Sequence, residues 1–364
     1  MKFKIQRTRF LEGLKYVQNV VASKGSLPIL QNVLLEVVGK TLTLTTTDLD
    51  ITVKSTIECE CVEAGASTLP VKLLTNFIVK SPECDIEIEI DARDQAVIKA
   101  NSARFKLNGK SKSEFPKMPE DEEFFEYLIE GEVFKNMLRK TSYAASQDDT
   151  RRTLKGVLMS FSDSKLTMVA TDGRRLALIE HEMEFPANNE KDIVLPSKAV
   201  QELLRDLENR KQIKILVSST RICFELEGVL IYSKLIDDAY PNYKQVIPKD
   251  CAEKIIIDRQ KLLEALERAS IMTMDEAHST KLIFEMNKLV VTSAANDVGE
   301  AQDVVEIKYA GEKIEIMFNP SYVMDPLKAI DDDEIIFNLN DGHSPAVIKC
   351  NDPFIYVLMP LRIS

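Results

Sequence analysis

The chain has 364 residues, which suffices for two or three domains that each bury a core of their own. Apolar residues make up 45% and charged residues 29%, as in soluble globular proteins, and no apolar run is long enough for a membrane span or a secretory signal. The net charge of −11 argues against a nucleic-acid-binding protein that depends on bulk positive charge.

The six cysteines are scattered along the chain, and none of them forms a Cys-x-x-Cys pair. Cys59 and Cys61 lie on one face of an expected strand, but two ligands do not make a zinc site. We therefore expect reduced thiols that serve mainly in packing, and a protein of the cytoplasm.

A pattern of about 120 residues returns three times along the chain. Its clearest marker is a proline that opens an apolar helix, at Pro70, Pro196 and Pro320, with spacings of 126 (196 − 70) and 124 (320 − 196). Matching positions also recur in a hairpin (Leu42, Leu166, Leu289) and in a later strand (Phe105, Tyr232, Tyr356). Repeats of this length are whole domains, since solenoid units run roughly 20–50 residues.

Each repeat is predicted to contain two similar halves, each made of a strand, a helix and three more strands. In the first repeat, Thr8 is expected to cap a helix whose residues Phe10, Leu14 and Val17 follow the spacing of one apolar face. A second helix should begin at Pro70, because the missing N–H of proline is unpaired at that position anyway. The strands expected in this repeat cover residues 3–5, 32–38, 41–46, 51–57, 86–90, 97–100 and 104–107.

The second repeat is expected to have helices around Phe134 and at 196–207, and the third around Leu262 and from Pro320. Their strands are predicted at 156–162, 165–170, 175–181, 213–217, 221–226, 230–235, 281–285, 289–292, 304–307, 335–339, 346–349 and 355–359. Proline-rich linkers divide the chain into predicted domains at 1–119, 120–247 and 248–364. This order of elements indicates an α+β protein in which each domain has two helices and two antiparallel sheets, with the helices on one face.

The search for catalytic chemistry favours a protein that is not an enzyme. The three histidines occupy non-equivalent places, and no complete nucleophile, zinc or phosphate-binding motif is present. Asp331–Asp333 fits a solvated turn, and the pair Asp48 and Asp50 lacks a third ligand. A metal-dependent hydrolase that uses Asp48, Asp50 or Asp172 stays as the second hypothesis, although metal hydrolysis needs several converging carboxylates.

Basic residues recur on the polar faces of the predicted helices. Lys72 and Lys80 follow Pro70, and Lys198 and Arg205 follow Pro196 in the same way. The helix around Phe134 carries Lys135 and Arg139, so the arrangement returns in separate repeats. Such a stripe is usually a solvated helix face, but its recurrence in an acidic chain favours weak, sequence-independent contact with phosphates.

Five local motifs give a specific resemblance. The stretches 26–33 (SLPILQNV), 47–51 (TDLDI), 170–177 (ATDGRRLA), 240–243 (YPNY) and 356–362 (YVLMPLR) resemble the signature stretches of the bacterial beta sliding clamp family. The resemblance spans the whole chain, in order and with the same triplication. It implies a processivity factor without cofactor or catalysis, of which one chain forms half of a ring and two chains meet head to tail around duplex DNA.

The resemblance also implies three functional surfaces. A cleft that captures short peptides from the polymerase, the clamp loader and repair proteins would comprise Arg151, Leu154, Thr171, Gly173, Arg174, Arg175, Leu176, Pro241, Val246, Val357, Met359, Pro360, Leu361 and Arg362. The residues expected to face DNA are Lys24, Lys72, Lys80, Lys135, Arg139, Lys198 and Arg205. The dimer contact would use Arg104, Phe105 and Leu107 on one side and Ile271, Met272, Glu300 and Asp303 on the other.

Within the cleft, we expect Leu154, Leu176, Pro241 and Val246 to form the floor of one pocket, with Arg174 or Arg175 at its mouth. Met359 and Leu361 are one strand period apart and should point to the same side.

Overall fold

The computed structural model describes residues 1–21, 27–117, 123–208, 210–273, 279–295 and 299–361. It divides into two compact units: unit 1 comprises residues 1–134 and 198–235, and unit 2 comprises residues 135–197 and 236–364. All three boundaries (134/135, 197/198 and 235/236) fall inside the second repeat, so each unit combines one terminal repeat with part of the middle one. Helices that cross a boundary are grouped below with the unit that holds most of their residues.

The strands of unit 1 come from two parts of the chain, residues 1–134 and 198–235. These are β1 (Lys2–Gln6), β2 (Asn32–Val38), β3 (Thr41–Thr47), β4 (Ile51–Glu58), β5 (Glu60–Glu63), β6 (Gly65–Pro70), β7 (Asp85–Ile90), β8 (Gln95–Ala100), β9 (Ala103–Asn108), β10 (Phe125–Glu130), β15 (Gln212–Val217), β16 (Arg221–Leu226) and β17 (Val229–Lys234). Its helices are α1 (Arg7–Val17), α2 (Val71–Lys80) and α4 (Ser197–Asp206), with the short 3-10 helices η1 (Pro28–Gln31) and η2 (Lys112–Glu114).

The strands of unit 2 are β11 (Gly156–Ser162), β12 (Lys165–Thr171), β13 (Arg175–Glu182), β14 (Lys191–Pro196), β18 (Glu253–Asp258), β19 (Thr280–Glu285), β20 (Lys288–Ala295), β21 (Gly299–Glu306), β22 (Ile314–Phe318), β23 (Glu334–Leu339), β24 (Ala346–Lys349) and β25 (Phe354–Leu358). Its helices are α3 (Gly131–Thr141), α5 (Arg259–Ser270) and α6 (Pro320–Ala329), with 3-10 helices η3 (Ser142–Ala144), η4 (Arg152–Lys155), η5 (Ala187–Asn189), η6 (Tyr243–Val246) and η7 (Ile271–Thr273). The predicted α+β class with antiparallel sheets is therefore confirmed.

One large sheet in each unit runs across a repeat boundary. In unit 1 its order is β10-β15-β16-β17-β4-β3-β2-β6, and in unit 2 it is β14-β11-β12-β13-β25-β24-β23-β18. The first joint, as we call the contact between repeats in unit 1, is the antiparallel pairing of β17 with β4. The second joint is the pairing of β13 with β25. The sequence predicted two sheets in each repeat, and it did not predict that neighbouring sheets join edge to edge.

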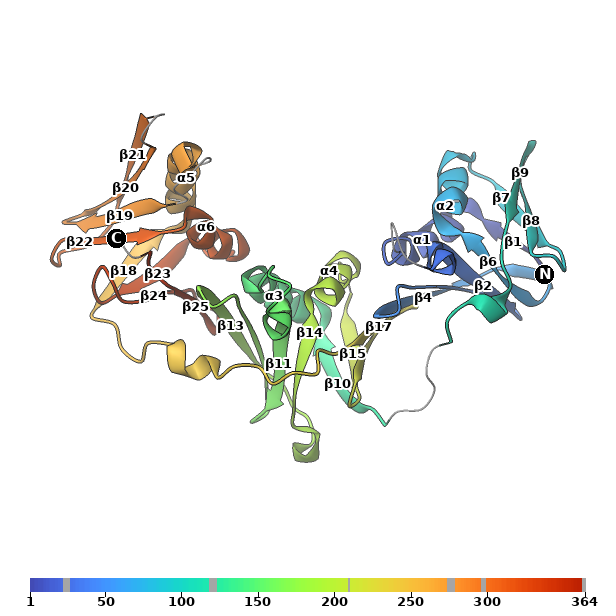
Figure 1. The fold of residues 1–364 in the computed structure, drawn as a ribbon, viewed down its shortest axis with the longest axis horizontal. Coiled ribbons are helices and arrows are strands. Elements are labelled where there is room, and N and C mark those ends of the chain that lie inside the picture. The colour runs from blue at the N-terminus through green and yellow to red at the C-terminus, as the bar shows by residue number, and fades with distance from the viewer. Residues whose placement is uncertain (22–26, 118–122, 209, 274–278, 296–298, 362–364) are drawn as a thin grey trace. The chain divides into compact units, whose positions relative to one another are not determined.

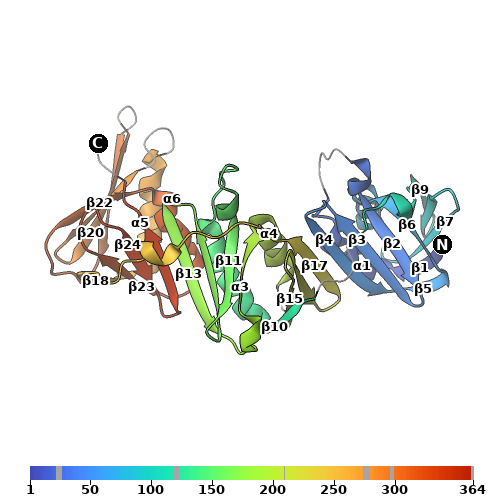
Figure 2. The ribbon, with the colours of Figure 1, turned by 60° about the horizontal axis from the view of Figure 1, so that its bottom comes forward.

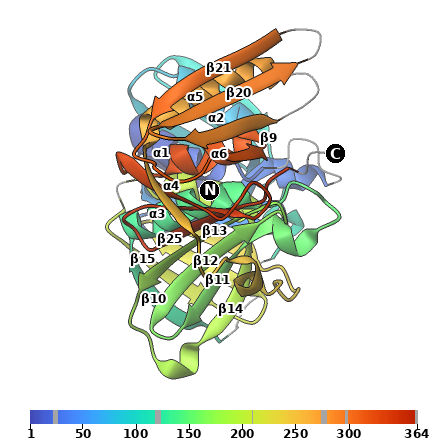
Figure 3. The same ribbon diagram turned by 90° about the vertical axis from the view of Figure 1, so that its left-hand side faces the viewer.

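A smaller sheet completes each unit. In unit 1 it has the order β5-β1-β7-β8-β9, and in unit 2 the order β21-β20-β19-β22. Helices α1 and α2 contact one another in unit 1, as α5 and α6 do in unit 2 (Figure 1). Figure 2 shows β4, β3, β2 and β6 side by side in the large sheet of unit 1, and Figure 3 shows the long β20–β21 hairpin beside α5.

The cores follow from the predicted periodicities. Phe10, Leu14 and Val17 of α1 are completely buried, as are Leu42 and Leu44 on one face of β3. Burial of each such side chain stabilises the fold by about 1.5–3 kcal/mol. Within the described residues, no helix is sufficiently long and apolar to cross a membrane.

The helix starts differ in detail from the predictions. Helix α1 begins at Arg7 after Gln6, whose side chain makes no capping bond, so Thr8 is not the N-cap. The Thr8 hydroxyl instead donates to the Glu83 carboxylate. Pro70 ends β6 and immediately precedes α2, whereas Pro320 is the first residue of α6 behind the Asn319 cap. A proline fits either place because neither needs its missing N–H.

Candidate functional site

The centre of the predicted cleft is a hydrogen-bonded turn between β12 and β13. The Thr171 hydroxyl donates to the Arg175 carbonyl (2.6 Å) and accepts from the Gly173 N–H (3.1 Å). One oxygen of Asp172 accepts from the N–H groups of Arg174 (2.8 Å) and Arg175 (3.1 Å). Gly173 has φ of +87°, which glycine adopts without the strain of a larger residue. The turn is therefore held by its own side chains.

Beside this turn lies an apolar cluster on one face of the large sheet of unit 2. Leu176, the second residue of β13, is paired in register with Val357 of β25. The buried members are Leu158, Val169, Leu176, Leu178, Val194, Val347 and Val357, and the partly buried residues packed against them are Ile236, Tyr240, Tyr243, Ile247, Cys251 and Ile355. Several of these partners belong to the proline-rich linker, so the linker folds back over the joint. The structure thus brings Leu176 and Val357 together and places the Pro241 segment beside them.

Three apolar residues of the predicted cleft keep free surface. Met359, Leu361 and Val246 are 42%, 36% and 47% exposed. The Met359 N–H donates to the Arg174 carbonyl (2.9 Å), and the Leu361 N–H donates to the Met317 carbonyl (2.8 Å). Chain ends are usually disordered unless they are tied down, so these two bonds hold the tail in place. Arg362 lies outside the described residues.

Two predicted cleft residues, Arg151 and Leu154, precede β11, and Arg151 contacts the turn. Arg151 donates from Nη1 to the Asp172 carbonyl (3.1 Å), which brings its exposed guanidinium next to Gly173. Leu154, in η4, is half-buried, and its carbonyl accepts from the Ser146 N–H (2.8 Å). Both predicted residues therefore lie in the same unit as the turn and the tail.

The two arginines of the turn differ in their surroundings. Arg174 is exposed, whereas the side chain of Arg175 is only 10% exposed and faces helix α6. Its guanidinium donates to Asp172 (3.0 Å), to Asp325 of α6 and to the Tyr143 carbonyl (2.6 Å). It also stacks on Tyr322, 4.3 Å from the ring centre. Of the two arginines expected at the mouth of the pocket, Arg174 alone has the exposure for that role.

The residues around Arg175 are missed by sequence reasoning. Tyr143 and Tyr356 pack with ring centres 5.9 Å apart, and the Tyr356 hydroxyl donates to the Tyr322 carbonyl (2.7 Å). Burial raises the pKa of Tyr143 well above its usual value, so its hydroxyl stays neutral. Asp325 lies in a helix with several other polar residues, and nothing in the local pattern distinguishes it.

The predicted DNA-facing residues of unit 1 lie on α2 and α4. Lys72 and Lys80 are exposed and form no ion pair with any described residue. Lys198 is ion-paired with Asp48 of the first joint, and Arg205 is paired with Glu202 of its own helix at 2.6 Å. The last two cations thus have part of their charge neutralised within the chain.

In unit 2, the predicted DNA-facing residues lie on α3. Arg139 is paired with Asp331, whereas Lys135 is half-buried and has no ion pair with a described residue. Lys140, which the sequence does not single out, is 2% exposed and paired with Asp352. This pair and the bond from Asn136 to Asp352 (3.3 Å) anchor α3 to the β24–β25 turn. Lys24 falls outside the described residues.

The predicted contact residues of unit 1 lie on β9, an edge strand of the small sheet. Arg104 is exposed, and Phe105 is half-buried and stacked on Phe77 of α2 at 4.8 Å. Leu73, also on α2, is 51% exposed, so the apolar face of this helix is wider than the part that the core buries. Leu107 is only 6% exposed and packs in the core, which differs from the open position expected for it.

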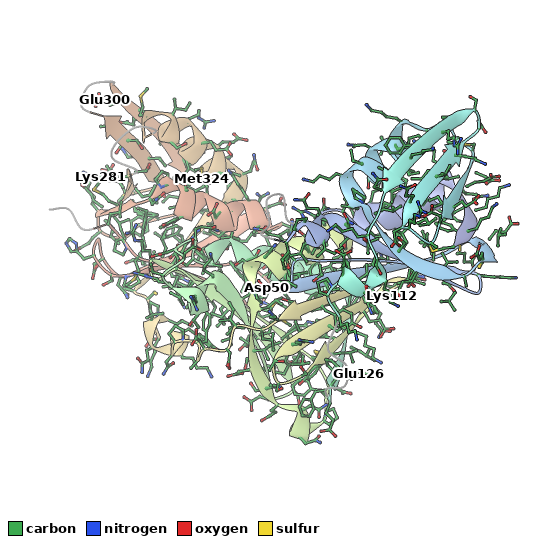
Figure 4. All side chains as sticks on the ribbon, turned by 45° about the vertical axis from the view of Figure 1, so that its right-hand side comes forward. Asp50, Lys112, Glu126, Lys281, Glu300 and Met324 are labelled. Carbon is green, nitrogen blue, oxygen red and sulfur yellow. The ribbon has the colours of Figure 1, made fainter. Side chains whose placement is uncertain are left out.

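In unit 2, the predicted contact residues gather around η7 and the edge strand β21. Ile271 is 59% exposed and Met272 half-buried, and Val304, which the sequence analysis missed, is 49% exposed. Glu300 is exposed near the end of the hairpin (Figure 4). Asp303 accepts from Arg268 at 2.5 Å, and this hydrogen bond lowers the pKa of its carboxyl group.

The aspartates of the hydrolase hypothesis are occupied by other bonds. One oxygen of Asp48 accepts from the N–H groups of Asp50 (3.0 Å) and Ile51 (2.7 Å), and the other meets Lys198. Asp172 is bonded in the same way to its own turn and to Arg175. No three His, Cys, Asp or Glu side chains among the described residues converge as a metal site. The hydrolase hypothesis therefore has no support.

Comparisons with known proteins agree along the whole chain. Models of the DNA polymerase III beta subunit match residues 1–119 (N-terminal domain), 128–242 (central domain) and 244–362 (C-terminal domain). The beta sliding clamp of Chlamydia muridarum is 31% identical over 363 residues, covering 100% of this chain and 99% of the relative. That of Pseudomonas aeruginosa is 32% identical over 368 residues, covering 100% of both.

Solved structures give the same result. A sliding clamp from Bartonella birtlesii, described as bound to griselimycin, has a TM-score of 0.96 and 32% identity, and 100% of each chain is covered. A DNA polymerase sliding clamp from Bacillus subtilis has a TM-score of 0.96 and 28% identity with the same coverage.

Proposed function

The chain belongs to the DNA polymerase III beta subunit family, the beta sliding clamps, and we propose that two copies close head to tail into a ring around duplex DNA. It is a non-catalytic processivity factor of DNA replication made of three clamp domains. The observation that carries this function is the full-length match to sliding clamps in both sequence and structure. The proposed domains are 1–119, 120–247 and 248–364, and the proposed compartment is the cytoplasm.

The proposed ring uses one contact twice, between the first domain of one chain and the third domain of the next. Two exposed features support it. Strand β9 is an open edge beside Leu73 and Phe105, and β21 is an open edge beside Ile271 and Val304. Open apolar edges invite pairing with another chain, and a head-to-tail contact would cover both.

Charged replacement of Ile271 and Met272 should therefore convert the dimer into monomers, because burying two new charges in an apolar contact is unfavourable. Analytical ultracentrifugation measures the change directly. Replacement of the exposed Val38, which is 73% exposed on β2 away from these contacts, is the matched control and should leave the dimer intact. A dimer that persists with both charges would overturn the proposed contact.

Duplex DNA is proposed to run past Lys24, Lys72, Lys80, Lys135, Arg139, Lys198 and Arg205 without sequence readout. Contacts of this kind are screened by salt and carry no base information, so they suit a protein that slides. The internal pairs of Arg139, Lys198 and Arg205 support weak rather than tight binding, since each carboxylate competes with a phosphate. High affinity is unnecessary if the ring holds DNA by its topology.

The polymerase, clamp loader and repair proteins are proposed to bind through short peptides at the cleft beside the Thr171–Arg175 turn. The exposed Met359, Leu361 and Val246 around a buried apolar cluster support an occupant with Leu or Phe anchors. Burial of one such anchor contributes about 1.5–3 kcal/mol. With two anchors and the cost of ordering a flexible peptide, we expect micromolar affinity.

Retention on DNA tests the function as a whole. The protein is loaded on nicked circular DNA with a clamp loader, and the same DNA is then cut at one site. A ring should stay on the circle and leave after linearisation, because free ends remove the topological hold. Equal retention on both forms would overturn the proposal, since ordinary binding does not depend on free ends.

A further inference from the structure

Arg175 was assigned to the cleft, but its side chain is directed at helix α6. Its guanidinium contacts Asp172 (3.0 Å), Asp325 and the Tyr143 carbonyl (2.6 Å), and it lies over the Tyr322 ring. With 10% of the side chain exposed, most of the donors of this group are used inside the protein. A bound peptide would therefore contact the backbone of Arg175 and of its neighbours rather than the charged guanidinium group.

The same turn occurs at the first joint with a different cation. The Thr47 hydroxyl donates to the Ile51 carbonyl (2.9 Å) and accepts from the Leu49 N–H (3.1 Å), as Thr171 does with Arg175 and Gly173. Asp48 bonds the next two N–H groups as Asp172 does. Leu49 and Gly173 also share a left-handed backbone, with φ of +82° and +87°. Each joint thus contains a turn of the same type.

In both turns the aspartate is connected to a helix of the following repeat. Asp48, with 7% of its side chain exposed, is paired with Lys198, two residues after the Pro196 marker on α4. Asp172, with 14% exposed, is paired with Arg175, which in turn is paired with Asp325 on α6. At the first joint the cation belongs to the helix, whereas at the second it belongs to the turn. A repeated connection of this kind in two separate units argues against a chance surface contact.

At the second joint the connected turn carries the cleft. The carbonyl of Arg174 accepts from the Met359 N–H (2.9 Å), and Leu176 directly follows Arg175 into the buried cluster. A shift of Arg175 relative to α6 would therefore displace Met359, through its bond to Arg174, and Leu176 together. The ring of Tyr322 and the bond from Tyr356 to the Tyr322 carbonyl (2.7 Å) fix the α6 side of this connection.

We propose that Arg175 and Asp325 act as a positioning pair, which sets the affinity of the cleft for peptides by fixing the Thr171–Arg175 turn against α6. This inference rests on the proposed peptide-binding function. It adds Asp325, a residue outside the cleft, to the groups that determine binding. The side chain of Arg175 is 10% exposed and that of Asp325 is 33% exposed, so the buried member of the pair is the arginine. A hydrogen-bonded ion pair is directional, so it can hold a backbone segment in one place.

The test is peptide affinity in the full-length Asp325→Asn variant, which keeps the shape of the side chain and removes its charge. The probe is a fluorescein-labelled synthetic peptide with a Leu-Phe pair and a polar flank, followed by fluorescence anisotropy and stopped-flow dissociation. We expect binding weaker by about tenfold, mainly through faster dissociation. Arg175→Met should weaken binding similarly, and the double variant should be little worse than either single one, because both remove the same pair.

Asp48→Asn is the matched control, since it breaks the equivalent connection in unit 1. It should leave peptide affinity unchanged, although its effect on melting temperature is expected to resemble that of Asp325→Asn. All variants are measured at a temperature where circular dichroism shows them folded, and Asp325→Glu, which keeps the charge, should recover most of the affinity. A purely structural pair would lower stability at both joints without this difference in binding.

Wild-type affinity in folded Asp325→Asn overturns the inference, and so does an equal loss of affinity in Asp48→Asn. A separate variant, Met359→Ala with Leu361→Ala, tests the cleft itself. If that variant and the wild type bind the probe equally, the proposed peptide site is wrong, whatever the result at Asp325.

Discussion

The two joints share a backbone plan but present different side chains beside it. At the second joint, the matched positions on one face of the sheet are Leu158, Val169, Leu176, Leu178, Val194 and Val357, all of them buried and apolar. The same register positions at the first joint are Leu34, Thr45, Thr52, Lys54, Thr68 and Tyr232. The strand pairing thus matches Tyr232 to Val357, one residue away from the Tyr356 that the sequence spacing predicted. Four of the six positions are thus Thr or Lys in unit 1, where unit 2 has Leu or Val.

Most of the polar groups of the first joint have partners within unit 1. The Thr68 hydroxyl donates to the Lys110 carbonyl (3.0 Å) and accepts from the Asn32 amide (2.9 Å), and Lys54 lies 5.8 Å from the centre of the Tyr232 ring. Leu34 packs with Ile29, Leu30 and Phe115, but the polar positions interrupt the apolar floor that a Leu or Phe anchor needs. A duplicated frame can thus differ in the character of one surface through a few side chains, without a change of fold, and the proposed cleft lies on the apolar one.

The largest expected effect comes from giving the second joint the polar character of the first. Leu176→Thr combined with Val357→Thr should weaken binding of the labelled peptide about 100-fold or more, because two apolar floor contacts are lost. Fluorescence anisotropy measures the affinity. Thr52→Leu, at the position in unit 1 that matches Leu176, is the control and should keep wild-type affinity. If the double variant still bound tightly, the cleft would not depend on this cluster.

A second feature of unit 1 is the carboxyl group of Asp206 on α4, the helix that meets the first joint. Burial, followed by the neighbouring Glu202, raises the pKa of Asp206 at the end of α4 to about 7. The folded state therefore retains a proton that the unfolded state releases above about pH 4, so stability falls as pH rises from about 4 to 7 and then levels off. Asp206→Asn should raise the free energy of unfolding by up to about 4 kcal/mol at pH 8.

Thermal unfolding at several pH values checks this expectation. Near pH 3 the variant and the wild type should melt at nearly the same temperature, since Asp206 is then almost fully protonated in both states. A gain in stability that is the same at pH 3 and pH 8 would contradict the assigned pKa.

The smallest expected effect lies at a single hydroxyl of the first joint. Thr45 is 2% exposed, and its Oγ1 has no hydrogen-bond partner among the described residues. An unpaired buried hydroxyl is unfavourable, so Thr45→Val should stabilise the fold by about 1 kcal/mol. Thr68→Val is the matched control and should destabilise it, because the Thr68 hydroxyl is bonded on both sides. Urea denaturation distinguishes the two, and the same sign for both variants would refute the argument.

Periodicity predicted most of the elements of each repeat but not all of them. The helices on Phe10, Pro70 and Pro320 and the alternating β3 strand are all confirmed. The pattern of the half-repeats predicted a strand before each helix, but it gave no residue bounds for β6, β10, β14, β18 and β22. Strand β5 was not predicted, since it has four residues and few of them are apolar. Resemblance to the family, rather than periodicity, predicted the cleft residues. Of these, Leu176, Val357 and Met359 lie beside the same turn, and Leu361 is bonded to Met317 in the same unit.

The sequence by itself determined the triplication, the α+β class and the family, because all three follow from local residue spacing and short motifs. Only the tertiary structure decided how the repeats join, since the pairing of β4 with β17 connects residues about 180 positions apart and leaves no local pattern. The direction of Arg175 was decided in the same way. Thr171-Asp172-Gly173 predicts a turn, but whether the guanidinium faces a peptide or a helix depends on Asp325, Tyr143 and Tyr322, which folding brings to it from distant parts of the chain.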